Sequence, residues 1–366
     1  MSVSSILVCV FGFLLFNFII MAHEWGHFIT AIKFGVKVKE FAIGMGPRVL
    51  KFQKGETIYS LRLLPIGGFC AMEGEEDPDS DSSDDDKEKK VIDPSRSLRN
   101  KAPWQKAIIM VAGIFMNFIV GLLLSIILTC CDNSLHTNVV QSVSSDTVDL
   151  SSVSEFEKLK EGDKIISING YKIVVNRDIK HAIRLSDNGS CELDVIRDGQ
   201  LVKIHTDITD DKPDGAQVVN MKFAPMEKNL MSVTSYAFAD VISIMKNSID
   251  SIIKLFTGKL SIKKLSGPIG VASSIGNMAF DKNKDVGSAL FSVTSMMMMI
   301  SIGLGVFNAI PFPALDGGRV VLLIPEIITG KPVNPKVEMI INAIGLISVL
   351  VLTGIIAYND IMSWRK

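Results

Sequence analysis

The sequence predicts an α-helical integral membrane protein with four transmembrane helices and a small inserted β-rich domain. The first observation is that four long runs contain no Asp, Glu, Lys or Arg, although such residues make up 21% of the chain; the runs are residues 5–22, 107–131, 286–315 and 339–359. The second is that alternating apolar and polar residues with turn signals occur only between these runs. Because the net charge is −1, no cationic excess exists to bind nucleic acid.

The first run opens the first predicted transmembrane helix, residues 1–34. No Lys or Arg precedes it and no cleavage site follows Ala22, so we expect a retained span and not a signal peptide. The helix should continue through two histidines to about Ile32. The other spans are predicted at 104–131, 286–325 and 337–360, each close to the roughly 20 residues that a bilayer requires or longer.

Lysine and arginine set the expected orientation. Fourteen lie from Lys33 to Lys106 and three lie in the connection between the third and fourth spans, which places both connections in the cytoplasm. Both termini and the long connection 132–285 are then expected outside, although Arg365 and Lys366 argue in the opposite direction. We therefore expect a multi-pass protein of the plasma membrane.

The segments between the spans differ in character. Residues 35–72 alternate apolar and polar residues between Gly and Pro breaks, which is typical of a β-hairpin. Residues 73–103 contain 11 acidic residues between Glu73 and Asp93, which predicts a disordered cytoplasmic linker. A regulatory or partner-binding tail is the alternative. Residues 226–285 predict an amphipathic helix, Leu230 to Phe256, followed by a connector.

Residues 135–225 predict the β-rich domain on the outer side. Short alternating strands are separated by the turn signals Asn169-Gly170 and Asp198-Gly199. The segment Lys160 to Gly170 resembles the strand-turn segment of PDZ domains. We expect an extracytoplasmic PDZ-like domain that either binds peptides or acts only as a steric filter.

The chemistry begins directly after the first uncharged run, in the segment His23-Glu24-Trp25-Gly26-His27. Residues i and i+4 share one face of a helix, so both imidazoles can reach one Zn²⁺ ion. Glu24 can then act as general base and return the proton to the leaving amine. Ionisable residues inside a span are costly and mark functional sites. The alternative is that both histidines only cap the inner end of the span.

A catalytic zinc site needs a third protein ligand at the same depth. Asp316 ends the longest uncharged run, and Pro311 and Pro313 must break the helix before it. Irregular backbone at membrane depth is tolerated where it lines a cavity. The first and third spans both enter from outside, so Asp316 should reach the same face as the histidines. The alternative role for Asp316 is to cap the following helix.

These motifs resemble the site-2 protease family of intramembrane zinc metalloproteases. The resemblance rests on His23 to His27 and on Ala314-Leu-Asp-Gly-Gly318, and it extends over most of the chain. The single PDZ-like domain is similar to the bacterial branch, which performs regulated intramembrane proteolysis. Ser266 to Gly270 and Ala112 to Phe118 resemble further family segments, although Ile114 stands where many members have proline.

The resemblance implies roles for individual residues. It implies that His23, His27 and Asp316 bind Zn²⁺ and that Glu24 is catalytic. It also implies that Asn308, and with it Asn117, lies at the substrate or the oxyanion; an ordinary helix–helix hydrogen bond is the alternative for both asparagines.

The resemblance also implies that residues 35–72 form a membrane-associated β-hairpin. A helical substrate hides its peptide bonds in its own hydrogen bonds, and pairing with an exposed strand edge would hold it unwound. We expect that edge at Tyr59 to Leu63.

The predicted function is hydrolysis of peptide bonds in or near the transmembrane segments of membrane proteins. The expected substrates are single-span proteins already cut by another protease, such as anti-sigma factors, remnant signal peptides or pheromone precursors. An alternative of another class is a catalytically inactive scaffold or receptor with a PDZ-like peptide-binding domain. Such a protein would not need His23, Glu24, His27 and Asp316, so the presence of all four argues against it. A metal transporter would need ionisable residues in more spans.

Overall fold

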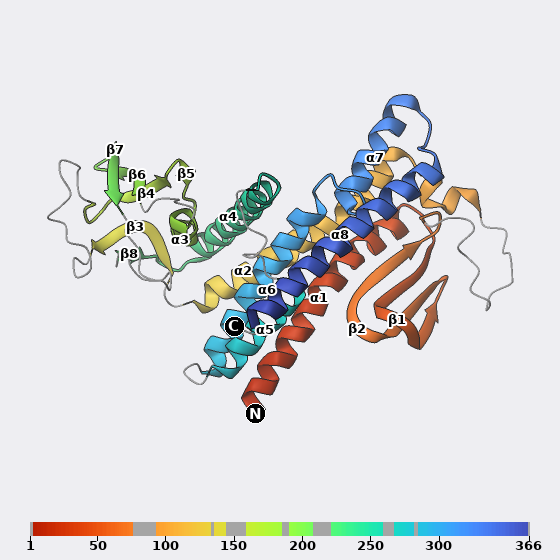
Figure 1. The fold of residues 1–366 in the computed structure, drawn as a ribbon, viewed down its shortest axis with the longest axis horizontal. Helices are drawn as coiled ribbons and strands as arrows, with labels where there is room; N and C mark the ends of the chain where they lie inside the picture. The colour runs from red at the N-terminus through yellow and green to blue at the C-terminus, as the bar shows by residue number, and fades with distance from the viewer. Residues whose placement is uncertain are drawn as a thin grey trace. The chain divides into compact units, whose positions relative to one another are not determined.

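The computed structural model describes residues 3–75, 93–132, 135–143, 159–184, 190–207, 221–258, 267–281 and 285–364 (Figure 1). Most of the predicted acidic linker, residues 76–92, lies outside the described residues. The chain divides into two compact units, and each is described by itself: Met1–Leu124 with Ser248–Lys366, and Ser125–Asn247.

Four helices of the described chain are long and apolar enough to cross a bilayer, which confirms the predicted number of spans. They are α1 (Val3–Lys33), α2 (Pro103–Cys131), α6 (Val286–Asn308) and α8 (Pro335–Trp364). Helical structure suits these uncharged runs because each backbone N–H and C=O group finds its partner within the same segment.

The third predicted segment, residues 286–325, consists of two helices separated by the break that its prolines predict. Helix α6 ends at Asn308, and α7 (Asp316–Thr329) begins after an irregular stretch that contains both prolines. Ala314 has a φ of 71°, in the left-handed region, just before Leu315 returns to extended backbone. Asp316 is therefore the first residue of a new helix, and only α6 is a candidate span.

A further helix, α5 (Pro268–Phe280), occupies the region that the sequence described only as a connector. Its first turn is held by α8, because Asp360 accepts hydrogen bonds from the backbone N–H groups of Gly267 (3.0 Å) and Gly270 (2.8 Å). A carboxylate at this end of a helix satisfies N–H groups that have no partner within the helix.

Strands β1 (Val38–Lys54) and β2 (Thr57–Met72) lie beside α1 (Figure 1). Two 3₁₀ turns, Pro94–Arg96 and Leu98–Asn100, precede α2. Both strands are long, and glycines with positive φ interrupt them at Gly44, Gly46 and Gly67. At Gly44 a Cβ atom would lie 2.3 Å from the carbonyl oxygen of Leu64, so only glycine fits.

Because of these bends, the hairpin has more pairing than two straight strands would allow. Residues 40–43 pair with 68–71 on one side and with 58–61 on the other, while 50–54 pair with 57–61. Residues 58–61 are therefore paired on both sides, and 68–71 form an outer edge of the sheet.

The second unit contains a β-sheet with the strand order β7-β6-β4-β3-β8, to which β5 is added along β4. Its elements are β3 (His136–Val143), β4 (Lys164–Ile168), β5 (Tyr171–Lys172), α3 (Asn176–Arg184), β6 (Ser190–Arg197), β7 (Gln200–Asp207) and β8 (Met221–Pro225). Alternate apolar residues such as Ile165, Leu193 and Val195 fill its core. Helix α4 (Leu230–Phe256) follows, and its residues up to Asn247 belong to this unit.

Candidate active site

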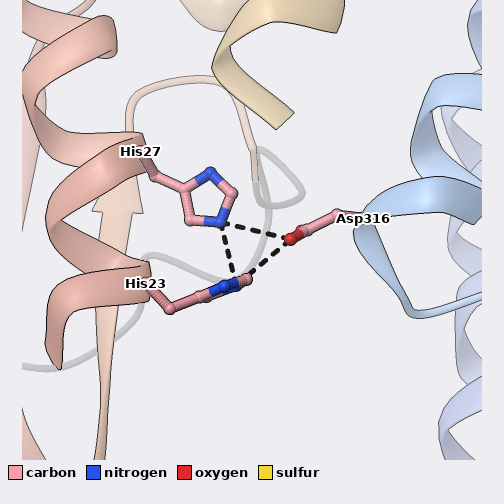
Figure 2. A group of neighbouring side chains, drawn as sticks. All are labelled: His23, His27 and Asp316. Carbon is pink, nitrogen blue, oxygen red and sulfur yellow. Dashed lines mark hydrogen bonds and ion pairs between the residues drawn. The ribbon is translucent and has the colours of Figure 1, made fainter. Parts of the chain in front are cut away.

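The structure brings together the two histidines and the distant aspartate that the sequence singled out. Helix α1 places His23 and His27 one turn apart on one face, and their Nε2 atoms are 3.2 Å apart. Asp316 enters from the start of α7, with Oδ2 3.1 Å from His23 Nε2 and 3.3 Å from His27 Nε2 (Figure 2). All three side chains point toward one another.

The spacing of these three atoms fits one face of a zinc tetrahedron. Ligands at about 2.0–2.1 Å from a central zinc ion lie about 3.3–3.4 Å from one another. Both histidines are buried, and Asp316 Oδ2 is a buried oxygen without a hydrogen-bond donor among the described residues. A buried carboxylate oxygen in that condition is costly unless a cation occupies the space beside it. Two imidazoles and one carboxylate are also a ligand set that catalytic zinc uses.

Small residues allow α1 and α2 to approach closely at the cluster. A Cβ atom on Gly26 would lie 2.4 Å from the carbonyl oxygen of Ala112, and one on Gly113 would lie 2.3 Å from His27 Nε2. The hydrogen atoms of these glycines leave room for the two imidazoles. Gly113 belongs to the segment 112–118 that resembles a family motif, and its small size has a direct structural reason.

The outer nitrogen of each imidazole also has a partner on α2. His27 Nδ1 lies 2.8 Å from the carbonyl oxygen of Ile109, which can only accept, so Nδ1 carries the proton and Nε2 keeps its lone pair. His23 Nδ1 lies 3.0 Å from the side-chain amide of Asn117, which is fully buried. The structure thus places Asn117 behind His23.

Glu24 lies between the cluster and the hairpin. Its Oε2 accepts a hydrogen bond of 3.0 Å from the backbone N–H of Cys70 in β2. Gly68 is equally close to α1, since a Cβ atom there would lie 2.8 Å from Met21 Sδ. The edge formed by residues 68–71 therefore faces the same side of α1 as Glu24.

Asn308 is the predicted site residue that the structure does not join to the cluster. It is half-buried at the last position of α6, and the hydrogen bonds of the described residues do not connect it with His23, His27 or Asp316.

Two ion pairs hold the helix that carries Asp316. Lys106 of α2 contacts Glu326 of α7 at 2.8 Å, with both side chains almost fully buried, and Arg319 of α7 pairs with Glu75 after β2. These ion-pair partners, like the backbone groups of Ile109 and Cys70, were not predicted from the sequence. Lys106 stands directly before the uncharged run 107–131, where a charged residue needs a partner, so the sequence did hold a signal for the pair with Glu326. No residue type marks a backbone carbonyl or N–H group as a partner.

Three side chains that could together hold a metal ion lie beside helices long enough to cross a membrane, an arrangement that fits a membrane-embedded metalloenzyme. The comparisons agree with that class: the sequence model of peptidase family M50 matches residues 11–352. The chain belongs to this family, the site-2 proteases, and is a multi-pass intramembrane zinc metalloprotease.

Relatives match along nearly the whole chain. A Clostridium perfringens protein is 31% identical over 356 residues, which is 96% of this chain and 98% of that protein. The regulator of sigma-W protease RasP of Bacillus subtilis is 27% identical over 428 aligned positions, covering 95% of this chain and 96% of RasP. Zinc metalloprotease RasP of Bacillus licheniformis is 26% identical, covering 95% and 97%.

Proposed function

We propose that His23, His27 and Asp316 are the zinc ligands of this protease and that Glu24 is its catalytic acid and base. The observation that carries the proposal is the buried triangle formed by the two Nε2 atoms and Asp316 Oδ2, whose sides measure 3.1–3.3 Å. Glu24 is the residue next to His23 in α1. When bound there, a zinc ion supplies Lewis acidity that polarises a carbonyl group and makes water nucleophilic near neutral pH.

The remaining chemistry belongs to Glu24. The Cys70 N–H group fixes Oε2 of the carboxylate, and Oε1 remains for proton transfer. Glu24 accepts a proton from the attacking water and donates it to the amine nitrogen of the leaving segment, so that the peptide bond is replaced by a carboxylate and an amine. The ion pairs of α7 hold Asp316 in place while this occurs.

The hairpin supplies the edge on which a substrate would unwind, but not at the residues that the sequence suggested. Tyr59 to Leu61 are paired on both sides, so they cannot accept another strand. Residues 68–71 have one unpaired edge, and this edge faces Glu24 through Cys70. An extended substrate segment along it would lie beside the proposed catalytic group. Exposed apolar residues of the hairpin, Leu50, Phe52 and Leu63, support contact with the membrane.

The orientation and the outer domain remain parts of the proposal. The cations between Lys33 and Lys106 follow the histidine end of α1, which supports a zinc site toward the cytoplasm. Residues 135–225 then lie outside, where their sheet and helix α3 support a PDZ-like domain. Such a domain would select single-span proteins that another protease has already shortened. It would do so either by binding a peptide or by excluding larger proteins.

The name of the Bacillus subtilis relative supports a substrate class. Its name is regulator of sigma-W protease RasP, and on this name we propose anti-sigma factors as substrates of this chain. Remnant signal peptides are the second class that the same site would accept, because both present a single helix with one shortened end.

The test is a Glu24→Gln variant of the full chain, purified beside the parent. Both proteins should contain one zinc ion, whereas cleavage of a single-span substrate should fall by about 10²- to 10⁴-fold in the variant, the usual contribution of a general acid–base group. Glu161→Gln, an exposed acid in the second unit, is the matched control and should cleave normally. Equal cleavage by Glu24→Gln, or a parent without zinc, would refute the assignment.

A further inference from the structure

We infer that Asn117 is a positioning residue for the zinc ligand His23, with its amide oxygen accepting a hydrogen bond from His23 Nδ1–H. This inference rests on the proposed ligand set. It gives Asn117 a role distinct from the substrate or oxyanion contact that the sequence resemblance implies.

The first step concerns the tautomer of His23. A neutral imidazole that binds zinc through Nε2 must carry its proton on Nδ1. The atom 3.0 Å from Nδ1 must then be an acceptor, and an asparagine offers only one, Oδ1. His27 shows the same arrangement with a group that cannot be anything but an acceptor, the carbonyl oxygen of Ile109 at 2.8 Å.

The second step concerns the two ends of the amide. With Nδ2 toward His23, Asn117 Oδ1 is a buried atom without a hydrogen-bond partner among the described residues. A half-turn of the amide exchanges two atoms of nearly equal size. The present orientation leaves a buried acceptor of the amide without a protein donor in the described part of the chain, so it has no advantage to set against the demand of the metal ligand. The oxygen faces His23 when zinc is bound.

The third step concerns the rigidity of the position. Asn117 is 0% exposed, and its backbone carbonyl oxygen accepts a hydrogen bond of 2.9 Å from Ser301 Oγ on α6. A Cβ atom on Gly305 of α6 would lie 3.3 Å from Asn117 Cβ, so α6 packs closely against this residue. The backbone and Cβ of Asn117 are therefore held against α6, and its buried side-chain amide lies against His23 Nδ1.

Partners of this kind orient a metal ligand and raise its basicity, and their loss typically lowers metal affinity by about 10- to 100-fold. Asn117→Leu keeps the approximate shape but removes the acceptor. Asn117→Asp keeps the acceptor and removes the donor. If the oxygen is the functional atom, the aspartate variant should retain the zinc affinity of the parent, and the leucine variant should not.

The experiment measures the zinc dissociation constant of the purified full chain by competition with a chromophoric chelator. Asn117→Leu should bind zinc about 10- to 100-fold more weakly, Asn117→Asp should bind at least as tightly as the parent, and Glu161→Gln, at an exposed position of the second unit, should match the parent. The visible absorption spectrum of the cobalt-substituted protein should change only in Asn117→Leu, since a purely structural role would not alter ligand geometry.

Each outcome is decisive. Unchanged zinc affinity and an unchanged cobalt spectrum in Asn117→Leu would overturn the inference, and reduced cleavage in that same protein would return Asn117 to a substrate-contacting role. Weak binding by Asn117→Asp as well as by Asn117→Leu would also overturn it, because the acceptor alone should suffice. A parent that binds no zinc would instead refute the proposed ligand set, which separates the two failures.

Discussion

Replacement of Gly113 by alanine should remove zinc from the protein while leaving the fold largely intact. The new Cβ atom would lie 2.3 Å from His27 Nε2 and 2.9 Å from His23 Cε1. Ordinary contact distances are about 3.5 Å or more, so the His27 ring would have to retreat by about 1 Å. A zinc ligand tolerates displacements of only about 0.2 Å, and the two imidazoles could no longer share one ion.

The cost to folding should be small by comparison. Crowding in a packed interior typically costs about 1–3 kcal/mol. Alanine is about 1 kcal/mol more favourable than glycine inside a helix, which offsets part of that cost. The free energy of unfolding should therefore fall by no more than about 2 kcal/mol, whereas zinc binding should be lost.

Metal analysis and thermal unfolding of the purified full chain separate these two effects. Gly354→Ala in α8 is the matched control, because beyond the helix's own backbone no heavy atom of the described residues lies within 4 Å of the new Cβ. The control should keep its zinc and its cleavage activity. A Gly113→Ala protein with one zinc ion and parental activity would refute the placement of the metal between these helices.

Three further predictions concern the supports of the site and the outer unit. Cys70→Pro removes the N–H group that holds the proposed general base and should lower kcat with zinc retained, whereas Cys70→Ala keeps that group and should cleave normally; equal rates for both would contradict the role. Lys106→Met leaves Glu326 buried and unpaired and should lower the unfolding free energy by about 3–5 kcal/mol, and a second Glu326→Met change should recover most of it; a single variant as stable as the parent in chemical denaturation would contradict this. Burial alone would raise the pKa of the Asp163 carboxyl, but the hydrogen bonds from Arg197 hold that pKa below its usual range. Ionised Asp163 therefore stabilises the folded unit fully above the pKa of about 3.9 that an aspartate has in the unfolded chain. This stabilisation is lost as the pH falls through the lower pKa of the folded protein. The protection of β4 and β6 amides against hydrogen exchange, taken relative to the intrinsic rate at each pH, should fall over that acidic range in the parent and less steeply in Arg197→Met. The same fall in both proteins would contradict the role of this ion pair.

The number of spans could be predicted because bilayer thickness fixes the length of an uncharged run. The pairing of His23 with His27 was equally accessible, since helical periodicity makes them neighbours within a single segment. Asp316 required topology in addition, and the structure places its oxygen 3.1 Å from His23.

The remaining features depend on contacts that residue types do not encode. Alternation indicated a hairpin, and the family resemblance placed an open edge at Tyr59 to Leu63. In the structure the strands bend at Gly44 and Gly67, and residues 58–61 are paired on both sides. The carbonyl of Ile109 and the N–H of Cys70 have no side-chain signature, so only the packed helices reveal them.

The break between α6 and α7 has a consequence for biosynthesis. Asp316 follows His27 by 289 positions and stands on a separate helix, so a ribosome completes the imidazole pair long before it makes the third ligand. Until α7 has docked, the nascent polypeptide carries only a fragment of the metal-binding set. Proteolytic competence thus arises late, after the whole bundle has been inserted, and neighbouring chains leaving the translocon are spared from premature cutting.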